Sequence, residues 1–104
     1  MREARRHKLE IPSDWLSDFC RCNRILRLSL FGSVLREDFH EGSDIDMLVE
    51  YEAGAQVGYF DMMRMQEELS DKLGASVDLR TPAELSKYFR GRVMEEAEVQ
   101  YVHR

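Results

Sequence analysis

Hydrophobic and polar residues alternate along this chain with two different periods. Apolar residues recur every three or four positions in residues 13–23 and again in residues 59–73, so each segment is predicted to form an amphipathic helix. Between these segments, Leu26, Leu28 and Leu30 alternate with polar residues, which is the two-residue period of a half-buried strand. The chain is therefore predicted to pass from a helix into a strand within its first third.

Two further strands are predicted beyond the first one. Residues 45–51 are largely apolar, and residues 76–80 form a shorter segment of the same kind. Gly74 lies just after the helix predicted at 59–73, where a helix C-terminus commonly has a glycine. Strands and helices thus alternate, which predicts an α/β or α+β fold with one small mixed sheet flanked by helices.

The pattern after position 80 is less uniform. Thr81 and Pro82 are typical of a helix start, with Thr81 as the cap and Pro82 in the first turn. We expect this helix to continue and to bend at Gly91. Residues 99–102 fit either the end of this helix or a small edge strand, and the sequence leaves both open.

The helix predicted at 59–73 carries an apolar stripe that contains methionines. Each member lies three or four positions after the one before it. The members are Met62, Met65, Leu69 and Leu73. Such a stripe can grip a partner protein, but packing into the core is the expected use.

Length and composition predict a single domain spanning residues 1–104. Of the 104 residues, 43% are hydrophobic and 34% are charged, which is typical of folded soluble proteins. The net charge of -5 argues against a broad phosphate-binding surface, so nucleic acid is not expected as a direct partner. No apolar run is long enough to cross a membrane or to serve as a secretory leader, and we expect a cytoplasmic protein.

The two cysteines, Cys20 and Cys22, do not predict a metal site. Two thiols without a second pair cannot complete a tetrahedral zinc site. Residues two apart in a helix also point in different directions. Both cysteines are therefore expected to be structural residues that are buried or half-buried.

Two aspartates, Asp44 and Asp46, flank Ile45 at the start of the second predicted strand. Residues two apart in a strand point to the same side, so both carboxylates are expected on one face while Ile45 enters the core. Adjacent carboxylates repel one another unless they are protonated or bridged by a cation. Hard oxygen ligands favour Mg²⁺ or Mn²⁺, so this pair predicts a site for such an ion.

A third carboxylate, Asp78, lies between Val77 and Leu79 in the predicted strand 76–80. If this strand lies beside the second one, three carboxylates converge. Such a set can hold two divalent cations about 3.5–4 Å apart, which together clamp an in-line phosphoryl displacement. Asp78 also fits a plain turn or capping role, and the pattern alone leaves both interpretations open.

The pair Gly32-Ser33 follows the first predicted strand directly. Gly32 lets the backbone approach a ligand closely, and the free amides at the start of a helix favour anions. These amides and the Ser33 hydroxyl could hold the phosphates of a nucleotide, with Arg36 one turn further on. Taken singly, Gly32-Ser33 also fits a simple strand-to-helix turn, and Arg36 a solvated surface residue.

Together these motifs resemble the signature of the nucleotidyltransferases of the DNA polymerase beta superfamily. The Gly-Ser pair is followed, after ten intervening residues, by Asp-x-Asp and later by a third aspartate. More closely, the chain resembles the bacterial minimal nucleotidyltransferases, the single-domain members that act as antitoxins beside HEPN-type toxins. The matching segments are residues 31–33, 43–46, 48–50, 77–82 and 96–98.

The resemblance implies roles for particular residues. Asp44, Asp46 and Asp78 would be the catalytic metal ligands, with two Mg²⁺ ions bound. Asp78 would also assist the deprotonation of the incoming hydroxyl. The residues expected to bind the ATP substrate are Gly32, Ser33, Arg36 and Ser43.

The function implied by the resemblance is that of a Mg²⁺-dependent protein adenylyltransferase. It would act as an antitoxin by transferring AMP from ATP to a tyrosine of a partner HEPN toxin, a ribonuclease. One alternative is a non-catalytic antitoxin that neutralises its toxin by binding alone, for which no metal ligands are needed. Another is a nucleotidyltransferase for a small-molecule hydroxyl, although such enzymes bring a second domain for which this chain leaves no residues.

Overall fold

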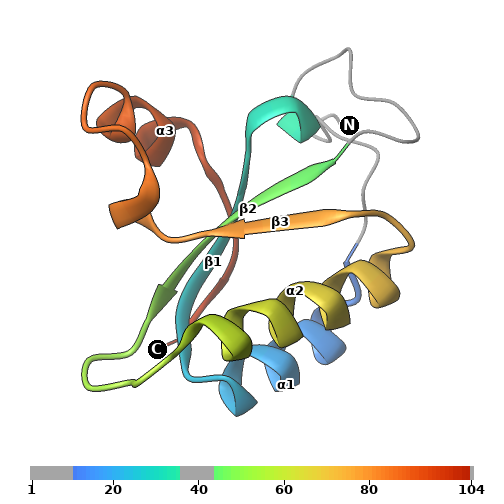
Figure 1. The fold of residues 1–104 in the computed structure, drawn as a ribbon. Coiled ribbons are helices and arrows are strands. Elements are labelled where there is room, and N and C mark those ends of the chain that lie inside the picture. The colour runs from blue at the N-terminus through green and yellow to red at the C-terminus, as the bar shows by residue number, and fades with distance from the viewer. Residues whose placement is uncertain (1–10, 36–43, 104) are drawn as a thin grey trace.

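The computed structural model describes residues 11–35 and 44–103, with Ser33 described by its backbone alone. Two predicted nucleotide-binding residues, Arg36 and Ser43, lie outside the described residues. The elements follow one another (Figure 1) as α1 (Ser13–Cys22), β1 (Ile25–Phe31), the 3₁₀ helix η1 (Gly32–Leu35), β2 (Ile45–Tyr51), α2 (Tyr59–Leu73), β3 (Val77–Arg80), the 3₁₀ helix η2 (Pro82–Glu84), α3 (Arg90–Glu96) and β4 (Glu98–Val102).

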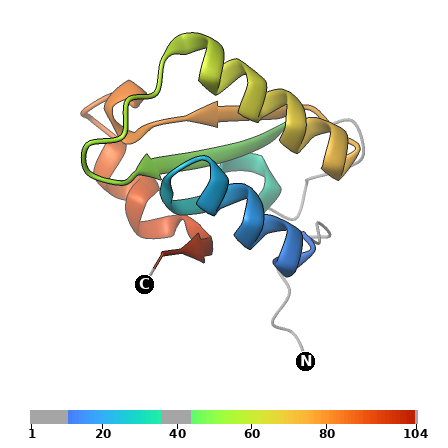
Figure 2. The same ribbon diagram turned by 90° about the horizontal axis from the view of Figure 1, so that it is seen from below.

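The four strands of the described chain form one mixed sheet in the order β3-β2-β1-β4. β1 pairs antiparallel with both β2 and β4, whereas β3 runs parallel to β2. Figure 1 and Figure 2 show α1 and α2 together on one face of this sheet, while α3 lies on the other side. The fold is therefore the small mixed sheet flanked by helices that the sequence predicts.

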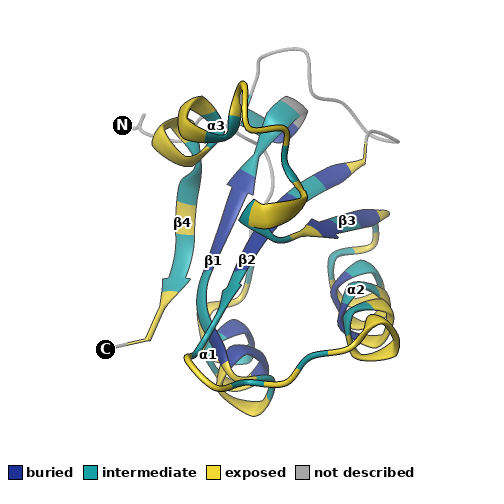
Figure 3. Cartoon of the chain, turned by 60° about the vertical axis from the view of Figure 1, so that its left-hand side comes forward, coloured by how far each residue is buried: buried dark blue, intermediate teal, exposed yellow. Residues whose placement is uncertain are grey.

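The core lies between the sheet and the layer formed by α1 and α2. Figure 3 shows buried residues on β1, β2 and β3 and on the parts of both helices that face them. Each aliphatic side chain buried in this way contributes about 1.5–3 kcal/mol of hydrophobic free energy. The most completely buried members are Cys20, Ile25, Leu28, Leu30, Val34, Ile45, Met47, Val49, Met65 and Leu69.

α2 has the bounds that its apolar period predicts. Met65 and Leu69 of its stripe are buried, and Met62 and Leu73 are partly buried against the core. The expected core use of the stripe is thus confirmed. Gly74 ends the helix in the left-handed conformation, with φ 69°, and its amide donates to the carbonyl of Ser70.

The prediction of one continuous helix from Thr81 is wrong. Thr81 caps only the short 3₁₀ helix η2, where its amide donates to the Glu84 carboxylate at 3.2 Å. The backbone becomes extended at Leu85, and α3 begins separately at Arg90. The Arg90 guanidinium donates to the carbonyls of Pro82 and Leu85, at 2.8 and 2.9 Å, and so ties the start of α3 to both ends of η2.

The alternatives left open for residues 99–102 are resolved in favour of a strand. β4 pairs antiparallel with β1, with an irregularity between Leu28 and Ser29. It therefore forms the edge of the sheet opposite β3. None of the helices in the described part of the chain is both long and apolar enough to cross a membrane.

The two cysteines of α1 differ in their surroundings. Cys20 is buried in the core, as expected, but Cys22 is exposed, so the expectation of burial is wrong for it. The reason is the helical period, which turns residues two apart to different sides of α1.

Candidate active site

Asp46 and Asp78 lie directly opposite one another on neighbouring strands. They are paired residues in the parallel register of β2 and β3, which confirms that the second and third strands are adjacent. Adjacent strands lie about 4.8 Å apart, and paired residues point to the same face. Ile45 and Val77 enter the core, so Asp46 and Asp78 point to the face opposite α1 and α2.

Asp44 lies immediately before β2 and is exposed. The amide of the next residue, Ile45, donates to the carbonyl of Ser76 at 2.8 Å, which fixes this end of β2 against the start of β3. The Asp-x-Asp pair therefore lies at the end of the sheet where the two parallel strands β2 and β3 begin. The convergence of its two carboxylates on one metal stays a prediction.

Position 32 requires glycine for two reasons, its backbone conformation and its closeness to Asp46. Its φ of +78° lies in the left-handed region, which L side chains rarely adopt. A Cβ at this position would also come within 2.5 Å of Asp46 Oδ2. The sequence suggests a close approach of Gly32 to a ligand, whereas the structure shows a close approach to Asp46.

The segment after Gly32 is a single 3₁₀ turn, η1, not a longer helix. Val34 is fully buried and anchors this turn to the core. Such a short turn has a small dipole, so anion binding here would depend on its individual backbone amides. Binding of phosphate by Gly32 and Ser33 stays a prediction.

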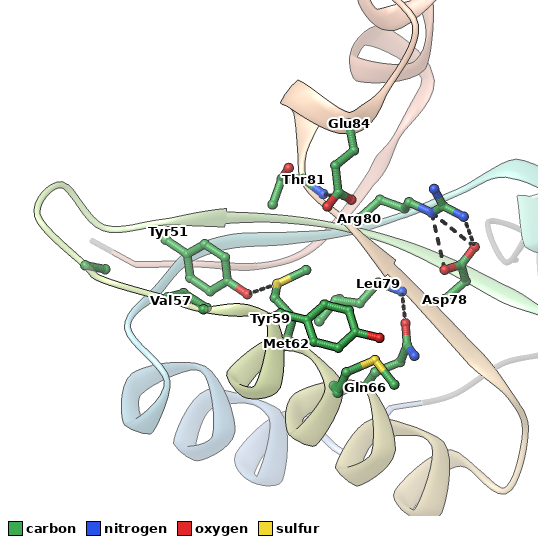
Figure 4. Close-up of a pocket in the computed structure, with 13 residues that line it drawn as sticks. Tyr51, Val57, Tyr59, Met62, Gln66, Asp78, Leu79, Arg80, Thr81 and Glu84 are labelled. Atoms are coloured by element: carbon green, nitrogen blue, oxygen red, sulfur yellow. Dashed lines mark hydrogen bonds and ion pairs between the residues drawn. The ribbon is translucent and has the colours of Figure 1, made fainter.

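Arg80 forms an ion pair with Asp78, which the sequence analysis missed. Its guanidinium donates from Nε to both carboxylate oxygens, at 3.3 and 3.2 Å, and from Nη2 to Oδ2 at 3.1 Å (Figure 4). This hydrogen bonding and the charge of Asp78 raise the pKa of Arg80, and Glu84 and Asp46 add to the rise. Asp78 and Arg80 are two residues apart on a strand, which puts both side chains on one face. This spacing was the signal in the sequence that could have revealed the ion pair.

The donor groups suit a hard divalent cation. Carboxylate oxygens are the ligands that Mg²⁺ prefers, and Asp46 and Asp78 present them from paired positions. In the described ranges, no three Asp, Glu, His or Cys side chains are gathered closely enough to hold a metal ion. Asp78 is turned towards Arg80, with which it forms an ion pair.

Glu50, the next carboxylate along β2, lies too far from Asp46 to serve as the third ligand. It lies four residues beyond Asp46 along β2, about 13 Å away at the rise of a strand. Its carboxylate pairs instead with Arg27 of β1, at 3.4 Å. Asp78 is therefore the better candidate for the third carboxylate of the site.

A pocket of about 600 Å³ adjoins the Asp78–Arg80 pair. It lies between β3, α2 and η2, and Figure 4 shows Asp78 and Arg80 at one end and Tyr51 and Val57 at the other. The Tyr51 hydroxyl donates to Met62 Sδ at 2.7 Å within its wall. Burial raises the pKa of Tyr51 to about 12, helped by the negative charges of Glu84 and Asp61.

Comparison with known protein families supports the chemistry suggested by this geometry. A family model described as the nucleotidyltransferase domain matches residues 13–99. A candidate protein adenylyltransferase of Methanocaldococcus jannaschii is 37% identical over 73 residues, which is 70% of this chain and 76% of that protein. A second candidate protein adenylyltransferase of the same organism is 32% identical over 73 residues, or 70% of this chain and 72% of that protein.

Solved structures share the fold. A candidate minimal nucleotidyltransferase has a TM-score of 0.67 at 32% identity, covering 82% of this chain and 85% of its own. A toxin–antitoxin crystal structure with AMP-PNP has a TM-score of 0.70 at 20% identity, covering 90% of this chain and 76% of its own. A complex of a tri-AMPylated Shewanella oneidensis HEPN toxin with an MNT antitoxin has a TM-score of 0.62 at 19% identity, covering 88% and 70%.

The two solved structures at 20% and 19% identity show only that the fold is shared. The family match and the relatives above 30% identity also show the family to which the chain belongs. The family model spans most of the chain, and the relatives at 37% and 32% identity are themselves named for nucleotidyl transfer. The chain therefore belongs to the nucleotidyltransferase domain family and is an enzyme of that family.

Proposed function

We propose that this enzyme transfers AMP from Mg²⁺-bound ATP to a tyrosine of a partner HEPN protein and so acts as its antitoxin. The observation that carries the proposal is the paired register of Asp46 and Asp78, with Gly32 packed against the Asp46 carboxylate. This arrangement brings the predicted phosphate-binding turn and two predicted metal ligands together on three neighbouring segments. The similarity to candidate protein adenylyltransferases supports AMP as the transferred group and a protein as the acceptor.

The reaction is an in-line displacement at the α-phosphorus of ATP. The acceptor oxygen forms a bond to this phosphorus, the bond from it to the bridging oxygen of pyrophosphate breaks, and pyrophosphate leaves. Asp44, Asp46 and Asp78 would hold magnesium, which supplies neutralisation of the phosphate charge. The backbone amides of Gly32 and Ser33 would hold the leaving pyrophosphate.

The proton of the acceptor hydroxyl needs a base, and Asp78 is the candidate. Its carboxylate borders the pocket, whereas Gly32 lies on the far side of Asp46 from that pocket. Transfer of the hydroxyl proton to this carboxylate, and from there to water, balances the reaction. Attachment of AMP would then inactivate a ribonuclease, because it adds bulk and negative charge where RNA phosphates must bind.

The test is to mix the chain with Mg-ATP and the HEPN protein encoded beside it, and to measure the intact mass of that protein. We expect a gain of one or more AMP units with the wild-type chain and none with Asp46→Asn. An unmodified HEPN protein that is nevertheless inhibited stoichiometrically would contradict the proposal and favour an antitoxin that acts by binding alone.

A further inference from the structure

Arg80 lies in the row of residues next to the two paired carboxylates. Asp46 on β2 is paired with Asp78 on β3, and two residues further along, Leu48 is paired with Arg80. Leu48 is buried and its side chain offers no hydrogen-bond partner. Residues two apart on a strand point to the same face, so Arg80 brings a positive charge to the face that carries Asp46 and Asp78.

The Arg80 side chain extends along β3 back to Asp78 (Figure 4). Its hydrogen bonds, at 3.1 to 3.3 Å, engage both oxygens of that carboxylate. These bonds and the charge of Asp78 raise the pKa of Arg80, and the charges of Glu84 and Asp46 add to the rise. The guanidinium therefore lies in the field of both strand carboxylates and is a counter-ion of the candidate metal site.

The carboxylate of Asp78 cannot serve Arg80 and a divalent cation in the same way at once. Both of its oxygens accept from the guanidinium, and a cation bound to either oxygen would place two positive charges side by side. The two side chains are about half exposed, so their ion pair is weak enough to open. Binding of a cation by Asp78 therefore requires another partner for Arg80.

The phosphates of ATP offer such a partner, because a guanidinium presents two parallel donors that match two phosphate oxygens. We propose that Arg80 exchanges partners during the catalytic cycle: it pairs with Asp78 before substrate binds, and it binds oxygens of the α-phosphate once ATP and its cation are bound. This inference rests on the proposed function and adds a residue that neutralises the reacting phosphate.

The order of the elements across the sheet favours the α-phosphate over the pyrophosphate. Gly32, whose amide is proposed to hold the pyrophosphate, follows β1, and Asp46 is on the neighbouring strand β2. Asp78 and Arg80 are on β3, on the other side of Asp46 from Gly32. The reacting phosphorus must be bound at the carboxylates. A positive charge at Arg80 would therefore stabilise the charge that develops around this phosphorus in the transition state.

Glu84 is the other destination open to Arg80. Its charge acts on Arg80, and its carboxylate accepts from the Thr81 amide at 3.2 Å. If Arg80 moved only to Glu84, it would contribute nothing to the binding of the nucleotide. Removal of the guanidinium would then leave the Kd of the nucleotide unchanged, so the two destinations differ in a measurable quantity.

Binding of α,β-methylene-ATP, which cannot release pyrophosphate, tests the exchange. Titration calorimetry at saturating Mg²⁺ would compare the wild type with Arg80→Gln and Arg80→Lys. The control is Arg92→Gln, which removes the same charge from an exposed ion pair on α3. We expect the Kd to rise about tenfold in Arg80→Gln, less in Arg80→Lys, which keeps the charge without the planar fork, and no more than about twofold in the control.

Two further ligands separate this role from a structural one. The Kd for Mn²⁺ alone should fall in Arg80→Gln, because loss of the pair with Asp78 favours the cation. The Kd for Mg-pyrophosphate should stay within about twofold of the wild type, because Arg80 is assigned to the α-phosphate. A variant that merely loosened the fold would weaken the binding of all three ligands.

The other outcomes would overturn the exchange or its details. An unchanged Kd for the nucleotide in Arg80→Gln would refute it, and so would an equal rise in Arg92→Gln, which would indicate net charge alone. An equal rise in the Kd for Mg-pyrophosphate would refute the assignment to the α-phosphate. If the wild-type chain transferred no AMP but the opposite changes in Kd were observed, the proposed function would be refuted and the exchange of partners supported.

Discussion

The carboxylate of Asp46 occupies the space that a side chain at Gly32 would need. A Cβ on Gly32 would lie 2.5 Å from Asp46 Oδ2 and 3.3 Å from Asp46 Cγ. Gly32 directly follows β1, whose last residue, Phe31, pairs with Asp46 of the antiparallel strand β2. The turn after β1 and the first carboxylate on β2 are therefore positioned by direct contact.

Gly32→Ala should destabilise the fold more than a substitution at another glycine of similar backbone conformation. Gly54→Ala is the matched control, because Gly54 has φ +86° but no atom within 4 Å of an added Cβ. The left-handed backbone costs about 1–2 kcal/mol in both variants, and only Gly32→Ala also displaces Asp46. Urea unfolding measures the difference. Equal losses in the two variants would show that the Asp46 contact is unimportant.

Asp44→Asn and Asp46→Asn should each abolish AMP transfer while the chain stays folded. Removal of one negative charge from neighbouring carboxylates relieves repulsion, so the free energy of unfolding should be unchanged or higher. Mass analysis of the acceptor and thermal unfolding without metal check the two statements. Full activity of Asp46→Asn would refute its assignment as a metal ligand.

Arg80→Gln should strengthen the binding of divalent cations, because Arg80 competes with a metal for Asp78. Both side chains are exposed, at 49% and 40%, so the ion pair has a modest free energy. We expect the Kd for Mn²⁺, measured by titration calorimetry, to fall by up to about fivefold. Arg92→Gln is the control. This substitution removes the same charge, but from an ion pair with Glu96 on α3. A similar fall in both variants would point to net charge alone.

Tyr51 should make the stability of the fold depend on pH in the alkaline range. Burial raises its pKa from 10.0 to about 12, so the folded chain keeps a proton that the unfolded chain loses. The contribution is complete below pH 10 and is lost as the pH rises towards 12. Urea unfolding should therefore show a larger alkaline loss for the wild type than for Tyr51→Phe. Identical pH profiles would contradict this.

The two thiols should react very differently with an alkylating reagent. Cys22 is exposed, whereas Cys20 is buried and its pKa is raised to about 12 by burial. Only the thiolate is nucleophilic, so the folded chain should consume one equivalent of reagent, and the denatured chain two. In Cys22→Ser the folded chain should not react, and rapid labelling of that variant would contradict the burial of Cys20.

The sequence predicts those features that depend on local period. The bounds of β2 and α2 agree with the structure, and Gly74 ends α2 as expected. The pairing of Asp46 with Asp78 could be stated only as a condition, because strand order depends on contacts between distant segments. The separation of η2 from α3 was missed because it depends on the Arg90 side chain reaching backbone carbonyls five and eight residues away.

A shift in the register of β3 would disrupt the core of the sheet and the candidate site at the same time. Val77 and Leu79 are buried, and Asp78 between them faces the other side. A slip of β3 by one residue along β2 would exchange the two faces, so that Asp78 would enter the core and both apolar residues would meet water. A buried, unpaired carboxylate costs several kcal/mol. Chains with this error would unfold, so newly made protein should contain no well-folded fraction that lacks Asp78 at the surface.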